Sequence, residues 1–309
     1  MEQKRHLLID ILIALLVLAV IVLIDHLIVN LKSKSADEDW PKKNSAQVDT
    51  GLIDGSPQLG SGQALTMAIL PGQKAFAPIL NFHRIDKAPA NADRIAKSYF
   101  VEPDKFEEII KGIIDDAYEP VFASELVGYL EKKELPSKQI LAITFDDGNE
   151  DFYTKAWPIL QKYKVKSSVY IMTGVGGPNY LTKDQITELD KSGLVQFGSH
   201  TVWHPKLTKI SESEQRRELK DSKDYLENLL GKKIEIICYP FGLYNDQVKQ
   251  IAKEVGYKAA LTFDQDAWQN PDDLFALTRI SVYPELGVMK FLDKLSAEGG
   301  SATGGRNEK

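Results

Sequence analysis

The sequence has very little cysteine and no excess of positive charge. Cys238 is the only cysteine among 309 residues, so the chain forms no intramolecular disulfide and no cysteine-based zinc site. A chain of this length can bury enough apolar surface to fold without disulfides. The net charge of −6 argues against a nucleic-acid partner, which would favour basic patches. The proportions of hydrophobic (43%) and charged (27%) residues are those of an ordinary globular protein and exclude a disordered chain.

One long hydrophobic segment is present, and it lies at the N-terminus. Residues 7–31 are almost wholly apolar, interrupted only by Asp10, Asp25, His26 and Asn30. About 20 residues cross a bilayer. No small-x-small cleavage site follows, as a secretory signal peptide would require. A cleaved signal peptide and a buried core helix are the alternatives. We favour an uncleaved signal anchor over residues 1–32, which makes the protein a single-pass cell-membrane protein with its remaining domain extracellular.

The rest of the chain divides into three parts. Residues 33–75 are rich in Ser, Asp, Lys, Gly, Gln and Pro, and we expect a flexible stalk. Residues 297–309 are expected to be a disordered tail. Between them, residues 76–296 form one predicted domain in which strands alternate with helices, which favours a parallel sheet and an α/β barrel-like fold. The predicted strands cover residues 78–82, 140–145, 167–172, 195–198, 234–239, 259–263 and 278–282, and the clearest helices cover 104–116, the segment after the capping box at 211–214, and 245–254.

Metal-ligating side chains follow two of these strands. Asp146 and Asp147 stand in Thr-Phe-Asp-Asp-Gly, directly after an apolar run; an ordinary acidic turn is the alternative, because Asp-Gly is a common turn dipeptide. His200 and His204 are four residues apart, so a helical turn or tight loop can aim both imidazoles at one point. A carboxylate and two imidazoles leave one coordination position open, as in a catalytic zinc site. Zinc suits this set best, and Co²⁺ or Ni²⁺ could occupy the same ligands.

Two further segments are expected to reach the same place. His83 follows the first predicted strand, and Tyr-Pro-Phe-Gly (residues 239–242) follows the fifth. In barrels of this kind the chemistry collects where the strands end. We therefore expect these residues to open onto one face together with the aspartates and the other histidines.

The motifs Thr-Phe-Asp-Asp-Gly (144–148) and His-Thr-Val-Trp-His-Pro (200–205) together resemble those of the polysaccharide deacetylases, the family-four carbohydrate esterases with a NodB-like domain. The resemblance covers about residues 76–296. No histidine follows His204, whereas commoner members have a late catalytic-acid histidine, so the layout is similar to the circularly permuted subgroup that includes biofilm poly-N-acetylglucosamine deacetylases. This implies a distorted (β/α)7 barrel and a metal-dependent hydrolase.

The resemblance also implies a substrate and alternatives to it. The expected reaction removes N-acetyl groups from N-acetylglucosamine residues of an exopolysaccharide or a cell-wall-linked glycan. The alternatives are a peptidoglycan N-acetylglucosamine deacetylase and a non-catalytic glycan-binding protein that retains the fold. Asp146 discriminates between the classes, because a pure binder would not need a general base.

Individual roles follow from the matched motifs. Asp146 is expected to act as general base and His83 as general acid. The backbone N–H of Phe241 is expected to complete the oxyanion site. Substrate contacts are expected from aromatic side chains at Trp203, Tyr239 and Tyr244. The implied metal ligands are Asp147, His200 and His204.

One position departs from the family pattern. The third family motif usually reads Arg-x-Pro-Tyr, and its arginine holds the catalytic aspartate. The matching stretch here is Cys-Tyr-Pro-Phe (residues 238–241), so that arginine is absent. Arg279, on the last predicted strand, is the candidate replacement.

Overall fold

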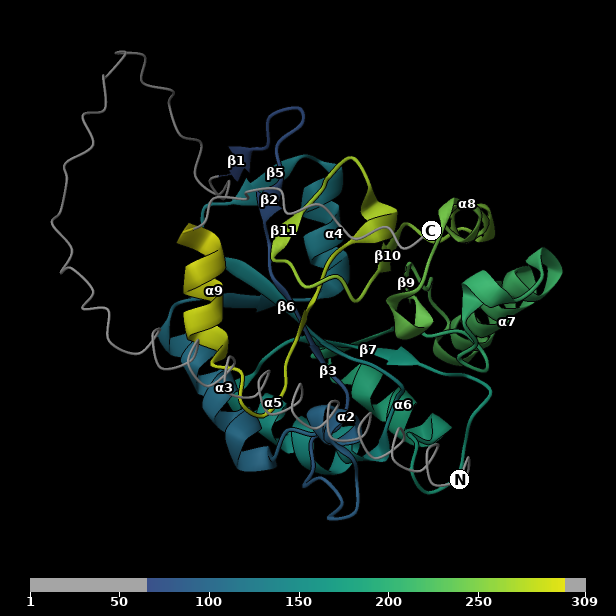
Figure 1. Cartoon of the computed structure of the whole chain (residues 1–309), viewed down its shortest axis with the longest axis horizontal. Helices are drawn as coiled ribbons and strands as arrows, with labels where there is room; N and C mark the ends of the chain where they lie inside the picture. The colour runs from purple at the N-terminus through teal and green to yellow at the C-terminus, as the bar shows by residue number, and fades with distance from the viewer. Residues whose placement is uncertain (1–65, 298–309) are drawn as a thin grey trace, which may run out of the picture. The chain divides into compact units, whose positions relative to one another are not determined.

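The computed structural model of the chain describes residues 66–297 (Figure 1). The predicted anchor at 1–32, most of the predicted stalk and nearly all of the predicted tail lie outside the described residues. Within 66–297, no helix combines the length and the hydropathy that a membrane crossing needs.

A parallel sheet forms the centre of the domain. Its strands follow the spatial order β10, β9, β8, β7, β6, β3, β12, and β4 pairs with the first half of β6. All of the strand pairs within this sheet are parallel. In chain order the strands are β3 (Ile79–Phe82), β4 (Glu119–Val121), β6 (Ile140–Phe145), β7 (Ser167–Ile171), β8 (Val195–Ser199), β9 (Ile236–Cys238), β10 (Ala259–Leu261) and β12 (Ile280–Ser281).

The edges of this sheet are joined by one short segment. Leu277 accepts a hydrogen bond from the N–H of Thr262 and donates one to the C=O of Ala260, beside β10. Three residues later the same segment enters β12, which pairs with β3. The α/β class and the parallel sheet are confirmed. The sheet is a curved half barrel, and a single bridge at Leu277, in place of a continuous ladder, links its two edges.

The two faces of the sheet pack into different cores, because successive strand residues point to opposite faces. We call inner face the one that contains Ile79, Ala142, Tyr170, Cys238 and Leu261. These residues pack together with helix α4 (Ala123–Glu131). The alternate residues of the same strands belong to a second, larger core on the outer face, where they pack with the other helices. The site described below lies where the inner-face positions run past the strand ends.

Consecutive helices lie side by side around the outer face, for example α6 against α7 and α7 against α8 (Figure 1). Their ends follow the predicted signals: Ser211 and Glu214 form a capping box at the start of α7, and Gly231 and Gly256 end α7 and α8 in left-handed conformations. The helices are α2 (Arg94–Ser98), α3 (Pro103–Asp115), α5 (Trp157–Tyr163), α6 (Lys183–Lys191), α7 (Glu212–Leu230), α8 (Asp246–Val255) and α9 (Val288–Ala297), with a π-helical turn at Phe152–Ala156 and 3₁₀ turns at Leu207–Lys209, Pro240–Gly242 and Leu274–Ala276.

Two small antiparallel sheets extend the domain beyond its predicted start. β1 (Thr66–Ala68) pairs with β5 (Glu134–Pro136), and β2 (Ala75–Phe76) pairs with β11 (Trp268–Gln269). The structure thus places strand residues at 66–68 and at Ala75, within the segment that was predicted to be a flexible stalk. Each strand is only two or three residues long and finds its partner more than 60 residues away, so no local periodicity marks it.

Candidate active site

Each of three strands ends beside a predicted site residue that lies on the inner face. His83, Asp146 and His200 lie just beyond β3, β6 and β8, each an even number of residues from an inner-face position. Asp146 continues β6, because its N–H donates to the C=O of Phe82 on the neighbouring strand. The chain then turns at Asp147, which has a φ of 72°. This left-handed turn explains how two adjacent aspartates reach different sides of the site.

Arg279, the residue just before β12, binds the Asp146 carboxylate. Its Nη1 and Nη2 donate to Oδ1 and Oδ2 of Asp146, each at 2.8 Å, and its Nε donates to the C=O of Thr262. Both side chains are buried. Burial is the largest single effect and raises the pKa of Asp146, but the charge and hydrogen bonds of Arg279, together with the charges of His200 and His83, outweigh it, so the pKa of this carboxyl lies well below its usual range. Arg279 thus makes the contact expected of the missing motif arginine.

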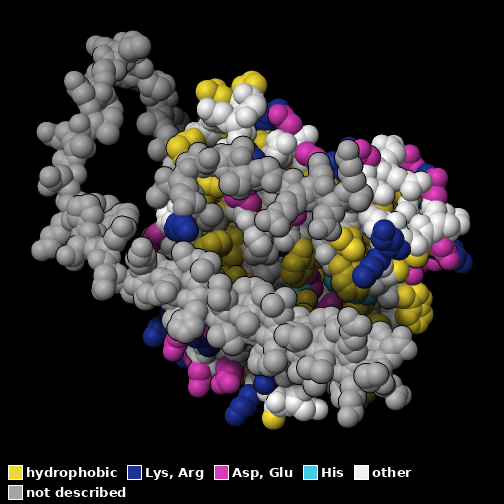
Figure 2. Space-filling view, in the orientation of Figure 1, with side chains coloured by type: hydrophobic (Ala, Val, Ile, Leu, Met, Phe, Trp, Pro, Cys, Tyr) yellow, Lys and Arg dark blue, Asp and Glu magenta, His cyan; other side chains and the backbone are white. Residues whose placement is uncertain are grey.

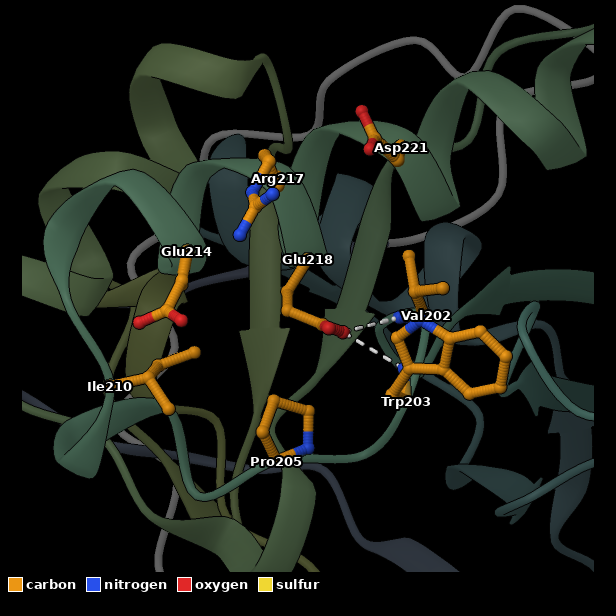
Figure 3. Close-up of a pocket in the computed structure, with 8 residues that line it drawn as sticks. All are labelled: Val202, Trp203, Pro205, Ile210, Glu214, Arg217, Glu218 and Asp221. Atoms are coloured by element: carbon orange, nitrogen blue, oxygen red, sulfur yellow. Dashed lines mark hydrogen bonds between the residues drawn. The ribbon is translucent and has the colours of Figure 1, made fainter.

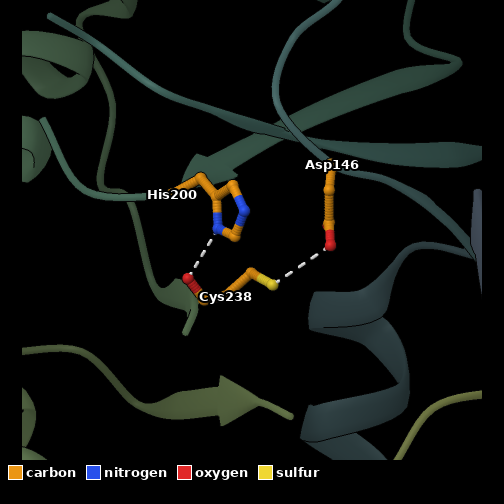
Figure 4. A group of neighbouring side chains, drawn as sticks. All are labelled: Asp146, His200 and Cys238. Atoms are coloured by element: carbon orange, nitrogen blue, oxygen red, sulfur yellow. Dashed lines mark hydrogen bonds between the residues drawn. The ribbon is translucent and has the colours of Figure 1, made fainter. Parts of the chain in front are cut away.

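Cys238 occupies the place of that missing arginine and does not serve as a ligand. Its thiol lies 3.5 Å from Oδ2 of Asp146 (Figure 4). The same sulfur lies 2.9 Å from Nη2 of Arg279. Asp146, His200 and Cys238 are close enough to form a metal-binding group. However, burial raises the pKa of the Cys238 thiol far above its ordinary value, and a metal ligand must be the thiolate. Both carboxylate oxygens of Asp146 also accept hydrogen bonds from Arg279. We therefore exclude this group as the metal site.

The second group, formed by Asp147, His200 and His204, fits a metal ion. One ligand atom from each lies within 4.8 Å of the others, and Nε2 of His200 is 3.6 Å from Oδ1 of Asp147. Nδ1 of His200 lies 2.8 Å from the C=O of Cys238. A carbonyl only accepts, so Nδ1 carries the proton and Nε2 presents its lone pair to the site. The structure therefore brings together the three predicted ligands, although the ion itself stays a prediction.

His204 and His83 are both held neutral. Burial lowers the pKa of His204 to about 4, with repulsion from His200 adding to the effect. Burial also lowers the pKa of His83, although Asp146 and Asp147 oppose this shift. Nε2 of His83 lies 3.9 Å from Oδ2 of Asp146. A proton bound to Asp146 would therefore lie beside the His83 imidazole.

The Pro240–Gly242 turn presents Phe241 at the site. Phe241 has a φ of 59° and a ψ of 9°, an unfavourable conformation for a residue with a side chain. Its ring packs on His204, with 4.5 Å between centroids. Among the described residues, its N–H takes part in no hydrogen bond that stabilises the turn. The predicted oxyanion donor is therefore close to a predicted metal ligand, and its backbone strain is of the kind that accumulates at functional sites.

The predicted substrate contacts do not all reach the site. Tyr239 is wholly buried and stacks on Tyr244, so its prediction as a substrate contact is wrong. The reason is the period of two: Cys238 points to the inner face, and Tyr239 points to the outer core. Tyr244 is half-buried and its hydroxyl donates to Asp264. Trp203 is 65% exposed but lines a neighbouring groove.

An open pocket of about 510 Å³ contains the site. Histidine side chains are visible as small cyan areas in a hollow bordered by hydrophobic side chains (Figure 2). A pocket of this size and mixed character suits a small organic group or a sugar. Its lining comprises His83, Arg84, Ala96, Tyr99, Phe100, Asp146, Asp147, Asn149, Tyr180, His200, His204, Phe241 and Phe263.

Sequence reasoning missed the side chains that support His83. The amide of Asn149 donates to the C=O of His83 at 3.2 Å. The buried carboxylate of Asp151 accepts from the N–H of Ile85 and pairs with Nε of Arg84. These polar residues closely follow the two aspartates in the sequence, and that proximity was the available signal. They tie the His83 segment to the segment that contains Asp146 and Asp147.

Comparison with known proteins agrees with this geometry. The polysaccharide deacetylase family profile matches residues 115–260. YxkH of Bacillus subtilis (strain 168), a polysaccharide deacetylase by name, is 30% identical over 258 residues, which cover 83% of this chain and 85% of YxkH. The poly-β-1,6-N-acetyl-D-glucosamine N-deacetylase of Staphylococcus aureus (strain MRSA252) is 28% identical over 302 residues, covering 91% of this chain and 93% of that enzyme.

A solved structure shows the same fold. The Streptococcus pyogenes deacetylase PplD, in complex with acetate, superimposes with a TM-score of 0.66 and 34% identity, over 72% of this chain and 99% of PplD. The half-barrel sheet, the converging aspartates and histidines and the extent of these similarities agree with one another. The chain is a member of the polysaccharide deacetylase family.

Proposed function

We propose that this protein is a metal-dependent N-deacetylase that acts on N-acetylglucosamine residues of an exopolysaccharide or a cell-wall-linked glycan. The observation that carries the proposal is the Asp147–His200–His204 group beside an Asp146 carboxylate that Arg279 keeps ionised. The substrate class is supported by the similarity to the staphylococcal enzyme, whose name specifies poly-β-1,6-N-acetylglucosamine.

Asp147, His200 and His204 would hold the metal. Two neutral imidazoles and one carboxylate are a donor set that suits zinc and leaves a position open; Co²⁺ and Ni²⁺ suit the same donors. A bound zinc ion would polarise the acetyl carbonyl and lower the pKa of a bound water towards about 7.

The side chains around this position would move the protons. As water adds to the acetyl carbonyl carbon, Asp146 takes one of its protons, and the N–H of Phe241 donates to the developing oxyanion. The carbon–nitrogen bond then breaks, the leaving nitrogen takes a proton from His83, and acetate and a free amine are released. Because His83 starts neutral, it needs the proton that Asp146 removed. The low pKa of Asp146 favours that transfer over the 3.9 Å between the two side chains.

The place of action is also proposed from the sequence. The apolar segment within residues 1–32 supports a membrane anchor, with the catalytic domain outside the cell. A surface glycan would then be within reach. Release of amines would make the polymer more cationic, which changes its electrostatic interactions with other surfaces.

The test measures acetate released by the purified, zinc-loaded protein. The substrates would be β-1,6-linked and β-1,4-linked N-acetylglucosamine oligomers and intact peptidoglycan. Asp146→Asn should abolish release, whereas Asp115→Asn, at the exposed end of α3, should leave it unchanged. Preference for peptidoglycan would reassign the substrate. No release from any polymer by protein with bound zinc would contradict the proposal and favour a glycan-binding protein.

A further inference from the structure

A helix side chain fastens the loop that joins the two predicted histidine ligands. Glu218 extends from α7, and its Oε2 accepts hydrogen bonds from the N–H groups of Val202 at 2.8 Å and Trp203 at 2.9 Å (Figure 3). Both donors lie between His200 and His204 in the sequence. Glu218 itself is absent from the lining of the catalytic pocket.

The loop needs such support because its backbone is strained. Thr201 and His204 have φ values of 65° and 56°. For residues with a side chain, this left-handed conformation costs roughly 1–2 kcal/mol each. The surrounding structure must offset that cost, or the loop would relax and separate the two imidazoles.

Hydrogen bonds fix the loop from two opposite sides. On one side, the C=O groups of Thr201 and Val202 accept from the N–H groups of Thr173 and Gly174, which follow β7. On the other side, the next two N–H groups along the loop donate to Glu218. The indole of Trp203 also lies directly over Gly174, where a Cβ would come within 2.8 Å of the ring. Side-chain oxygens within the segment, Ser199 Oγ and Thr201 Oγ1, also accept from the N–H groups of Thr201 and His204, and Glu218 adds a direct contact from α7 to the loop backbone.

Among the described residues, the Glu218 carboxylate forms hydrogen bonds with this loop only. Within residues 66–297, Glu218 takes part in no ion pair, and its two hydrogen bonds are those to the loop. Hydrogen bonds to a charged acceptor are stronger than neutral ones. Asp221 lines the same groove of about 360 Å³ from the same helix but contacts no loop N–H. Asp221 therefore provides a matched control for the loss of a carboxylate at this place.

We propose that Glu218 is a positioning residue that sets the separation and orientation of the His200 and His204 imidazoles for metal binding. It acts through the backbone of Val202 and Trp203 and touches neither imidazole. The proposal rests on the metal site proposed above. Residues that orient metal ligands from outside typically change metal affinity or activity about 10- to 100-fold when they are replaced.

The experiment titrates zinc into the metal-free full-length protein against a chromophoric chelator, and records the visible spectrum of the Co²⁺-loaded protein. Glu218→Ala should weaken zinc binding about 10- to 100-fold and alter the Co²⁺ spectrum. Glu218→Gln keeps an acceptor oxygen and should lose less. Asp221→Asn should bind zinc as the wild type does. The thermal midpoint of each metal-free variant separates weaker metal binding from simple loss of the fold.

Each outcome has a definite meaning. Zinc affinity of Glu218→Ala within twofold of the wild type, with an unchanged Co²⁺ spectrum, would refute the positioning role while the metal site stands. Failure of the wild type itself to bind zinc would refute the metal site and this role together. If Glu218→Ala does not fold, Glu218→Asp, which is one methylene shorter, serves for the same comparison, and wild-type affinity in that variant would equally refute the role.

Discussion

Replacing Arg279 with methionine is expected to destabilise the protein strongly and in a pH-dependent way. The substitution keeps most of the buried volume but removes both hydrogen bonds to Asp146 and the one to the C=O of Thr262. Asp146 is then left as a buried carboxylate without a cation. Removing one partner of a buried ion pair typically costs about 3–5 kcal/mol of unfolding free energy. For a domain of this size, that corresponds to a fall in thermal midpoint of roughly 6–20 °C.

The pH dependence follows from the sign of the pKa shift. In the wild type the pKa of Asp146 is depressed, so its contribution to stability is present above the unfolded pKa of about 4 and is lost as pH falls below that value. Without Arg279, burial raises the pKa of Asp146 above its unfolded value. The variant then loses most unfolding free energy at neutral pH, where Asp146 must either stay ionised while buried or take up a proton. The stability gap between wild type and variant should narrow as pH falls from 7 to 4.

The assay is denaturant unfolding of both proteins at several pH values, combined with a double-mutant cycle. Asp146→Asn in the Arg279→Met background removes the uncompensated charge, so the double variant should be more stable than Arg279→Met alone. A loss below about 1 kcal/mol, or a stability gap that does not change with pH, would refute the assignment of Arg279 as the partner that keeps Asp146 ionised.

Two further predictions concern the turn beside the site and the neutral histidines. Gly242→Ala should cost more unfolding free energy than Gly231→Ala in denaturant unfolding, and only Gly242→Ala should reduce acetate release: both glycines have a φ of 66°, but a Cβ at 242 would come within 2.4 Å of Phe263, whereas Gly231 faces open space. Equal losses would show that φ alone matters. Because burial lowers the pKa of His204 from 6.5 to about 4, the unfolded chain binds more protons than the metal-free native protein in that window, so the thermal midpoint should fall as pH drops from 6.5 to 4 and His204→Gln should flatten the change. A steeper fall in that variant would contradict the argument.

Local patterns were enough to predict most of the elements. The apolar runs placed seven of the eight strands of the parallel sheet, β12 included, within two residues at each end. The capping box at Ser211 and the glycines at 231 and 256 marked the helix ends, because cap geometry depends on neighbouring residues only. β4 was missed, since three residues that include Pro120 carry no periodic signal. Its place is decided by pairing with β6.

The sequence by itself determined which residue types stand at the strand ends, and the alternation along β3, β6 and β8 directs His83, Asp146 and His200 to one face. Only the tertiary structure decided how they work together. The curved sheet brings Arg279 to Asp146 across 133 residues of chain, and α7 brings Glu218 to the histidine loop. Backbone turns with positive φ separate Asp147 from Asp146. These contacts depend on how distant segments pack around one core, so the spacing of residues along the chain cannot predict them.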